Sequence, residues 1–284
     1  MKVVLVYNTE SGSDSSIKEL RKIFTDSSIK IIDSIKIRSG FEPSLKPHIK
    51  RREIIAVVGG DGSISAVANL MKDTDAVLMP LPGGTLNHFT KDLGVPQSLP
   101  DALEYFKTAK KVKIDTGQVC NKTFINNSSI GIYPDSLMDR NEHKKKYGKW
   151  LAILTSILTA FFRFRTYRVE LNGKQYSTPL VFVGNNTYEL NGLTFQRSQL
   201  QEGVLSIYIV IGKSRLNLFW AVVGLILGRK NVAKKLKSFR AKDIVIATNK
   251  SIRVSRDGEH EKMTSPLRYS VKESSLYILK RPTK

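Results

Sequence analysis

The sequence contains a single cysteine, Cys120, among its 284 residues. One cysteine excludes an internal disulfide, which fits a protein of the reducing cytoplasm. Long apolar runs are missing too, because the two longest, 150–162 and 216–228, are too short to cross a bilayer. The first seven residues read as a strand and lack the apolar core and cleavage site of a signal peptide. We therefore expect a cytoplasmic, globular protein.

Acidic residues are scarce, since 25 Asp and Glu face 46 Lys and Arg and give a net charge of +21. Such an excess indicates an acidic partner, which could be a nucleotide, a nucleic acid or an anionic membrane surface. Basic residues flank both apolar runs, at 144–168 and at 229–240. This pattern is typical of an interfacial membrane contact, although a buried core with solubilising lysines explains it equally well. No motif of a nucleic-acid-binding module occurs, so no nucleic acid is expected.

Two common nucleotide-binding motifs are absent. The sequence has no Gly-x-x-x-x-Gly-Lys-Ser/Thr and no Gly-x-Gly-x-x-Gly after its first strand. Instead, the apolar runs 54–58 and 76–79 each lead into a glycine-rich turn, at 59–63 and at 83–87. Continuous apolar runs predict buried parallel strands, and ligands bind at the carboxyl ends of such strands. The two turns therefore predict a phosphate site, and the alternative is a pair of tight turns with steric roles alone.

Three motifs together resemble the diacylglycerol kinase catalytic-domain family. They are Gly59-Gly60-Asp61-Gly62-Ser63, Gly84-Thr85-Leu86-Asn87-His88-Phe89 and Asp257-Gly258-Glu259. That family includes bacterial soluble lipid kinases and is related to sphingosine kinases and, more distantly, to NAD kinases. The resemblance implies an α/β nucleotide-binding domain, a β-sandwich-like second domain with helical insertions, and an active site in the cleft between them.

The pattern along the chain agrees with this division. Residues 1–113 alternate strands and helices as in an α/β domain, which 272–284 would complete. Residues 114–271 are dominated by short β-branched and aromatic segments, which predict a β-rich lipid or substrate domain. The expected strands include 175–183, 267–271 and 275–279. Two helices are expected within the second domain, at 135–162 and 214–227.

The resemblance also implies a set of nucleotide-binding residues at three places. They are Asn8, Ser11, Gly12, Gly59, Gly60, Asp61, Gly62, Ser63, Gly84, Thr85 and Asn87. Ser11 could equally be a helix cap. His88 stands where the family usually has Asp, so we assign it no catalytic role.

Acidic residues are the candidates for chemistry and for a metal. By the resemblance, Glu259 is the candidate general base, and Asp257 would position it or hold Mg²⁺, although Asp-Gly is also a good hairpin turn. Asp61 would organise Mg²⁺ beside the phosphates or act as the base itself. Glu202 stands where many relatives have an Asp that holds a structural metal, and we favour a plain turn there.

These features together predict an ATP-dependent, Mg²⁺-requiring lipid kinase that associates peripherally with an anionic membrane. Its acceptor would be a hydroxyl of diacylglycerol or a similar lipid, which would place it in phospholipid metabolism. Two alternatives stay open: a kinase for a soluble acceptor such as NAD, and a non-catalytic protein that binds a nucleotide or a nucleic acid.

Overall fold

The computed structural model describes residues 1–8, 14–85, 87–131, 166–171, 173–191, 194–197, 199–211, 216–217, 236–248 and 251–282. They form two compact units. The first unit contains Met1–Asn126, Arg197–Gly203 and Val271–Lys284, and the second contains Asn127–Gln196 and Val204–Ser270. The domain limits expected from the sequence, 113 and 271, remain a prediction.

The first unit is built on a parallel sheet. Its strands follow the order β2-β1-β3-β4-β18, with β5 on the far side of β18. The first four strands are β1 (Lys2–Tyr7), β2 (Lys30–Lys36), β3 (Ile54–Gly59) and β4 (Val77–Pro82). Every residue of β4 and all but the first of β3 are buried. This burial is what the continuous apolar runs predict for central parallel strands.

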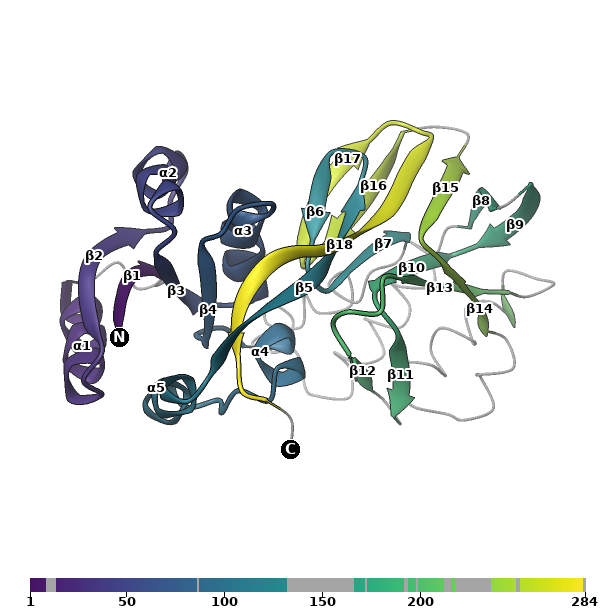
Figure 1. Ribbon diagram of the computed structural model, residues 1–284. Coiled ribbons are helices and arrows are strands. Elements are labelled where there is room, and N and C mark those ends of the chain that lie inside the picture. Colours follow the sequence, from purple (N-terminus) through teal and green to yellow (C-terminus); the bar gives the residue numbers. More distant parts are fainter. Residues whose placement is uncertain are drawn as a thin grey trace, which may run out of the picture. The chain divides into compact units, whose positions relative to one another are not determined.

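Helices cover both faces of this sheet. They are α1 (Asp14–Asp26), α2 (Glu42–Lys50), α3 (Asp61–Met71), α4 (His88–Asp92) and α5 (Leu99–Lys107). Helix α2 packs against α3 on one face, while α1 packs against α5 on the other (Figure 1). Their apolar sides join the strands in one core, in which Phe24, Ile64 and Phe106 are almost fully buried. The expected α/β domain is confirmed.

Strand β18 (Leu267–Lys280) differs from the expectation of two short strands at 267–271 and 275–279. Its exposed centre, Lys272-Glu273-Ser274, reads as a turn in the sequence. In the structure Ser274 has a positive φ of 49°, and its N–H donates to the buried Asp115 carboxylate of β5 (Lys110–Val119) at 2.8 Å. The hydrogen bond to Asp115 therefore helps to keep β18 continuous through a segment whose sequence predicts the end of a strand.

The second unit consists mainly of antiparallel strands. One sheet has the order β14-β13-β10-β7-β16-β17, formed by β14 (Leu236–Ala241), β13 (Leu205–Val210), β10 (Leu180–Asn185), β7 (Asn127–Gly131), β16 (Ile252–Arg256) and β17 (Glu259–Met263). The first residues of β18 pair with β15 (Asp243–Thr248), which pairs with β8 (Tyr167–Leu171), and β8 pairs with β9 (Lys174–Thr178). The Tyr269 hydroxyl of β18 lies 3.1 Å from the Ser128 hydroxyl of β7 and so links the two layers. The sandwich-like second region is confirmed.

Shorter elements complete the picture. β6 (Lys122–Phe124) forms a hairpin with β5, and β11 (Tyr188–Asn191) pairs with β12 (Thr194–Arg197). The single strand expected at 175–183 is in fact two strands, because Pro179 has no N–H to donate and separates β9 from β10. The helices expected at 135–162 and 214–227 lie outside the described residues, apart from 216–217. None of the helices within the described ranges is long and apolar enough to span a membrane.

Candidate active site

The first glycine turn joins β3 directly to α3. Gly59 ends the strand, Gly60 is the extended residue before the helix, and Asp61 is the first helical residue. A Cβ atom on Gly59 would lie 2.6 Å from the Cβ atom of Ser63, so no larger residue fits there. The turn places the amino end of an eleven-residue helix at the carboxyl end of a central strand, which is a favourable place for an anion.

The second glycine turn lies in contact with the first. The Gly83 N–H donates to the Gly59 carbonyl at 3.1 Å. A Cβ atom on Gly84 would lie 2.5 Å from the Gly60 Cα atom, and one on Gly83 would lie 2.7 Å from the Gly59 nitrogen. Two segments about 25 residues apart thus touch backbone to backbone, and packing requires glycine at positions 83 and 84.

Asn87 shapes the second turn from within. It has a left-handed φ of 51°, is 8% exposed, and stands immediately before α4. Its Oδ1 atom accepts a hydrogen bond from the Gly84 N–H at 2.9 Å. Asparagine tolerates this backbone conformation better than most residues. Asn87 therefore fixes the loop, while Thr85 within the loop is exposed.

The Asp61 carboxylate connects the two turns. Its Oδ2 atom accepts the His88 N–H at 3.0 Å, and its Oδ1 atom accepts the Phe89 N–H at 2.8 Å. Oδ1 also accepts the Asn126 side-chain amide at 3.3 Å. Asp61 thus caps the amino end of α4 from a neighbouring helix, where a negative charge is favourable. The His88 side chain is exposed, and only its backbone takes part.

Asn8, at the end of β1, reaches the same region. Its side-chain amide donates to the Ser63 hydroxyl at 3.2 Å, and its N–H donates to the Val58 carbonyl at 3.1 Å. The structure therefore brings Asn8 together with the first glycine turn. Ser11 and Gly12 lie outside the described residues.

A buried arginine that the sequence reading did not single out belongs to this region. The Arg197 side chain is fully buried, and its Nε atom lies 2.8 Å from Oδ2 of Asp92 at the end of α4. It also donates to the Ile125 carbonyl and to the Asn126 side chain, both at 2.6 Å. Arg197 is 71 residues from Asn126 along the chain. No local pattern in the sequence could have revealed these contacts.

The third motif lies in the second unit and forms the turn of the β16–β17 hairpin. Asp257 and Gly258 both have positive φ, 46° and 91°, as a two-residue hairpin turn requires. Asp257 is 5% exposed, and its Oδ1 atom accepts the Asn127 N–H at 3.0 Å. Glu259 begins β17 and is exposed. The predicted meeting of this motif with Asp61 in one active site remains a prediction.

Comparisons with known proteins agree with these motifs. Residues 2–119 match the diacylglycerol kinase catalytic domain, and residues 135–280 match the YegS C-terminal NAD kinase beta sandwich-like domain. The chain belongs to the diacylglycerol kinase catalytic-domain family. This membership confirms the coarse expectation of a kinase.

Individual relatives of this kinase are distant. It is 24% identical over 255 residues to a protein named "putative lipid kinase" from Staphylococcus aureus strain MSSA476. The aligned region covers 84% of this chain and 80% of that relative. The same figures hold for the protein of that name from strain MW2. A solved structure titled a "putative diacylglycerol kinase" from Bacillus anthracis superposes with a TM-score of 0.74 at 23% identity, over 99% of this chain and 97% of the other. At that identity the likeness shows the fold alone.

Asp61 is the carboxylate beside the glycine turns that could hold a magnesium ion. No three acidic, histidine or cysteine side chains among the described residues gather closely enough to hold a metal by themselves. Mg²⁺ is commonly bound by one or two carboxylates together with substrate phosphates and waters. Asp61 suits such a site, because its Oδ2 atom accepts one hydrogen bond where Oδ1 accepts two.

The loop at Glu202-Gly203 is held by hydrogen bonds. The Gly203 N–H donates to Oδ2 of the buried Asp115, and the Ser274 N–H donates to Oδ1, both at 2.8 Å. Gly203 has a positive φ of 63°, as in a tight turn. These contacts need no metal ion, and the metal role of Glu202 stays a prediction.

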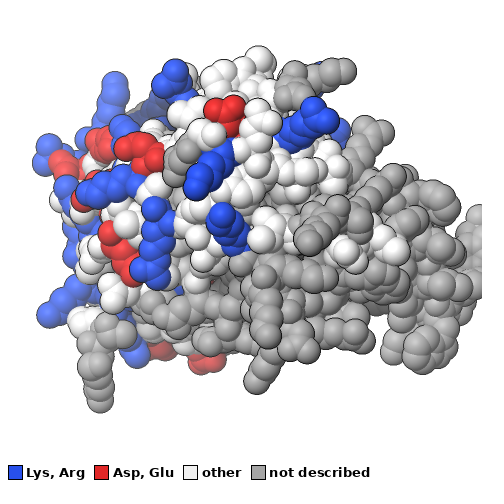
Figure 2. Space-filling view, turned by 90° about the vertical axis from the view of Figure 1, so that its right-hand side faces the viewer, with Lys and Arg blue, Asp and Glu red and all other residues white. Residues whose placement is uncertain are grey.

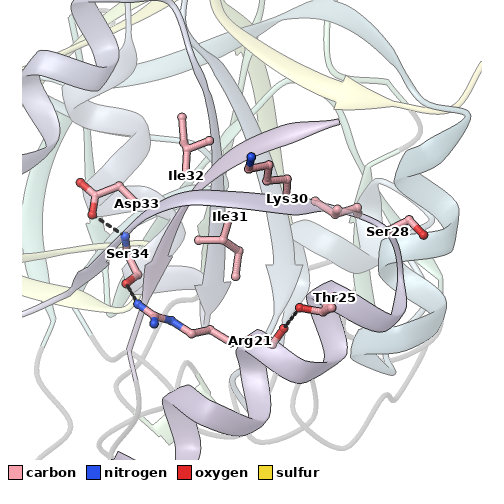
Figure 3. Close-up of a pocket in the computed structure, with 9 residues that line it drawn as sticks. Arg21, Thr25, Ser28, Lys30, Ile31, Ile32, Asp33 and Ser34 are labelled. Carbon is pink, nitrogen blue, oxygen red and sulfur yellow. Dashed lines mark hydrogen bonds between the residues drawn. The ribbon is translucent and has the colours of Figure 1, made fainter.

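A hollow elsewhere in the kinase does not belong to this site. It has a volume of about 590 Å³ and follows the outer edge of β2, lined by Arg21, Thr25 and residues 28–34 (Figure 3). Arg21 crosses it to donate to the Ser34 hydroxyl at 2.7 Å. The hollow begins at the amino end of β2, whereas ligands of open α/β sheets bind beyond the carboxyl ends. The glycine turns, at the carboxyl ends of β3 and β4, therefore remain the predicted nucleotide site.

Proposed function

We propose that this protein is an ATP-dependent lipid kinase that transfers the γ-phosphoryl group to a hydroxyl of diacylglycerol or a similar lipid. The observation that carries the proposal is the contact between the two glycine turns, with the Asp61 carboxylate between them. A helix amino end, closely packed glycines and one carboxylate are the parts that a phosphate site needs.

The nucleotide side of the reaction uses residues of the first unit. In this proposal the backbone of Gly59–Ser63 and Gly84–Thr85 holds the phosphates, with the Ser63 and Thr85 hydroxyls as added donors. Asn8 positions Ser63. Ser11 and Gly12, which lie outside the described residues, would add phosphate contacts as the resemblance implies. Asp61 would hold Mg²⁺, and the ion would neutralise charge on the transferred phosphoryl group.

The acceptor side uses the third motif. Glu259 takes the proton of the lipid hydroxyl as that oxygen attacks the γ-phosphorus and the bond to the β-phosphate oxygen breaks. Asp257 supports it by holding the hairpin turn, or as a second Mg²⁺ ligand. The exposure of Glu259 is compatible with a base that must meet an incoming substrate.

A lipid acceptor also requires contact with a membrane. The net charge of +21 supports peripheral association with an anionic surface from the cytoplasmic side. Figure 2 shows lysines and arginines gathered over described parts of one face, with fewer acidic side chains among them. The two apolar runs proposed to dock lie almost wholly outside the described residues.

The test is phosphate transfer from labelled ATP with Mg²⁺ in mixed micelles. The acceptors are diacylglycerol, monoacylglycerol, ceramide, sphingosine and phosphatidylglycerol, with NAD as the soluble control. We expect one labelled lipid, with a rate that falls about 100-fold or more in Asp61→Asn and in Glu259→Gln. Label in NAD alone would replace the proposal with a soluble-acceptor kinase. Absence of any label, with ATP still bound, would favour a non-catalytic nucleotide-binding protein.

A further inference from the structure

Arg197 holds three acceptors at once near the glycine turns. Its guanidinium donates to Asp92 at 2.8 Å, to the Ile125 carbonyl at 2.6 Å and to Oδ1 of Asn126 at 2.6 Å. The side chain is fully buried, and that of Asp92 is only 8% exposed. The planar fork of arginine can hold three acceptors in fixed directions, which the ammonium group of lysine cannot do.

These contacts decide how the Asn126 amide is oriented. A guanidinium has only donors, so the Asn126 oxygen must face Arg197. The Asn126 NH₂ group then points to the other side, where it donates to Oδ1 of Asp61 at 3.3 Å. Asn126 is 3% exposed, so solvent does not compete for either end of the amide.

The same arginine also fixes the helix that Asp61 caps. Asp92 is the last residue of α4, and the N–H groups of His88 and Phe89 at the start of that helix donate to Asp61. Arg197 therefore acts on Asp61 by two routes, through Asn126 to Oδ1 and through α4 to both oxygens. With Oδ1 bound twice, Oδ2 is the atom turned to further ligands.

We propose that Arg197 is a positioning residue that, through Asn126 and α4, aims Oδ2 of Asp61 at the Mg²⁺ of a bound nucleotide. Arg197 itself touches neither the metal nor the substrate. This inference rests on the proposed function, because it deepens the role given there to Asp61. Groups that orient a metal ligand in this way commonly change metal affinity or activity by 10- to 100-fold when they are replaced.

The test is a double-mutant cycle on Mg²⁺-dependent ATP binding, measured by calorimetry on the full chain. Arg197→Lys keeps a positive charge beside Asp92 but loses the fork, so the variant should still fold. We expect the Mg²⁺ concentration for half-maximal ATP binding to rise about 10-fold. In the Asp61→Asn background the same substitution should change this Mg²⁺ concentration less than about 2-fold, because the carboxylate that Arg197 positions is already absent.

A matched control is Arg281→Lys, the same substitution at another arginine of the first unit. Arg281 also binds main-chain carbonyls in the first unit, at Tyr105 and Glu104, but it is not part of the Asp61 network. It should lower stability while leaving the Mg²⁺ dependence unchanged. A purely structural role for Arg197 would give the same result as this control.

The outcomes separate this inference from the proposed function. An unchanged Mg²⁺ dependence in Arg197→Lys, or an equal loss with and without Asp61, would overturn the positioning role alone. If the effect of Arg197→Lys depends on Asp61 but no acceptor is phosphorylated, the positioning role is supported and the proposed lipid-kinase activity is contradicted. A wild-type protein that binds no nucleotide would overturn both.

Discussion

Gly60 and Gly84 face each other across the two turns, yet their neighbours leave them different amounts of room. A Cβ atom on Gly84 would lie 2.5 Å from the Gly60 Cα atom, whereas one on Gly60 would meet nothing closer than 3.4 Å. Gly60 has an ordinary φ of −80°. The glycine at 84 is therefore explained by packing, while the one at 60 is not.

This difference yields a prediction that separates a steric turn from a phosphate cradle. We expect Gly84→Ala to lower the free energy of unfolding by about 1–3 kcal/mol, because the turns must move apart. Gly60→Ala should fold with nearly unchanged stability but lose ATP binding at least 10-fold, because a methyl group there would stand where the phosphate approaches. Urea denaturation and calorimetry measure the two quantities. Full ATP binding by Gly60→Ala would contradict the cradle.

A second prediction at the residue scale concerns Glu53 and pH. Burial alone would raise the pKa of the Glu53 carboxyl, but hydrogen bonds from Arg51 and His48 outweigh it and hold the pKa below the ordinary 4.5. His48 lies 2.6 Å from Glu53 and 2.8 Å from Asp33, and so ties α2 to β2. Because the folded-state pKa is lowered, this stabilisation is present above pH 4.5 and is lost as the pH falls below it.

The measurement is the free energy of unfolding of wild type and Glu53→Gln between pH 7 and pH 3. We expect wild type to be more stable by about 1–2 kcal/mol at pH 7, with the gap closing below pH 4.5. Glu19→Gln, on the exposed side of α1, is the matched control and should show no such gap. A gap that stayed constant to pH 3 would refute the assignment.

At the scale of elements, the β16–β17 hairpin carries both a structural and a proposed chemical role. Asp257 must adopt a positive φ and accept the Asn127 N–H, and asparagine can do both. We therefore expect the free energy of unfolding of Asp257→Asn to lie within about 0.5 kcal/mol of the wild-type value. That of Asp257→Ala should be lower by about 1–3 kcal/mol.

The same pair of variants tests the charge on Asp257. If the carboxylate supports Glu259 or Mg²⁺, phosphate transfer by Asp257→Asn should fall 10-fold or more although the hairpin is intact. Stability is measured by urea denaturation and transfer with the labelled-ATP assay. Normal phosphate transfer by Asp257→Asn would mean that Asp257 serves only to form the hairpin turn.

At the scale of the whole molecule, the charge of +21 predicts salt-dependent membrane binding. We expect the protein to sediment with vesicles of phosphatidylglycerol at low ionic strength and to be released at about 0.5 M salt, because screening shortens the range of the attraction. Neutral phosphatidylcholine vesicles are the control. Equal binding to both kinds of vesicle, or none to either, would argue against an electrostatic membrane contact.

Much of the architecture could be predicted because it depends on local patterns. The apolar runs before the two turns became the buried strands β3 and β4, and the change to short β-branched segments marked the sandwich-like region. The predictions were wrong where contacts between distant residues decide where a strand begins and ends. Strand β18 is continuous because Asp115 holds Ser274, and the expected strand at 175–183 is divided at Pro179 between two different pairings.

The candidate site divides in the same way. The sequence by itself determined the family, the glycine turns and the acids, because these are runs of adjacent residues whose chemistry is local. Only the tertiary structure decided that Gly84 touches Gly60, that Asp61 caps α4, and that Arg197 donates a hydrogen bond to Asn126. The physical reason is that burial and hydrogen-bond partners are set by which segments the sheet brings together, and one sequence does not contain those distances.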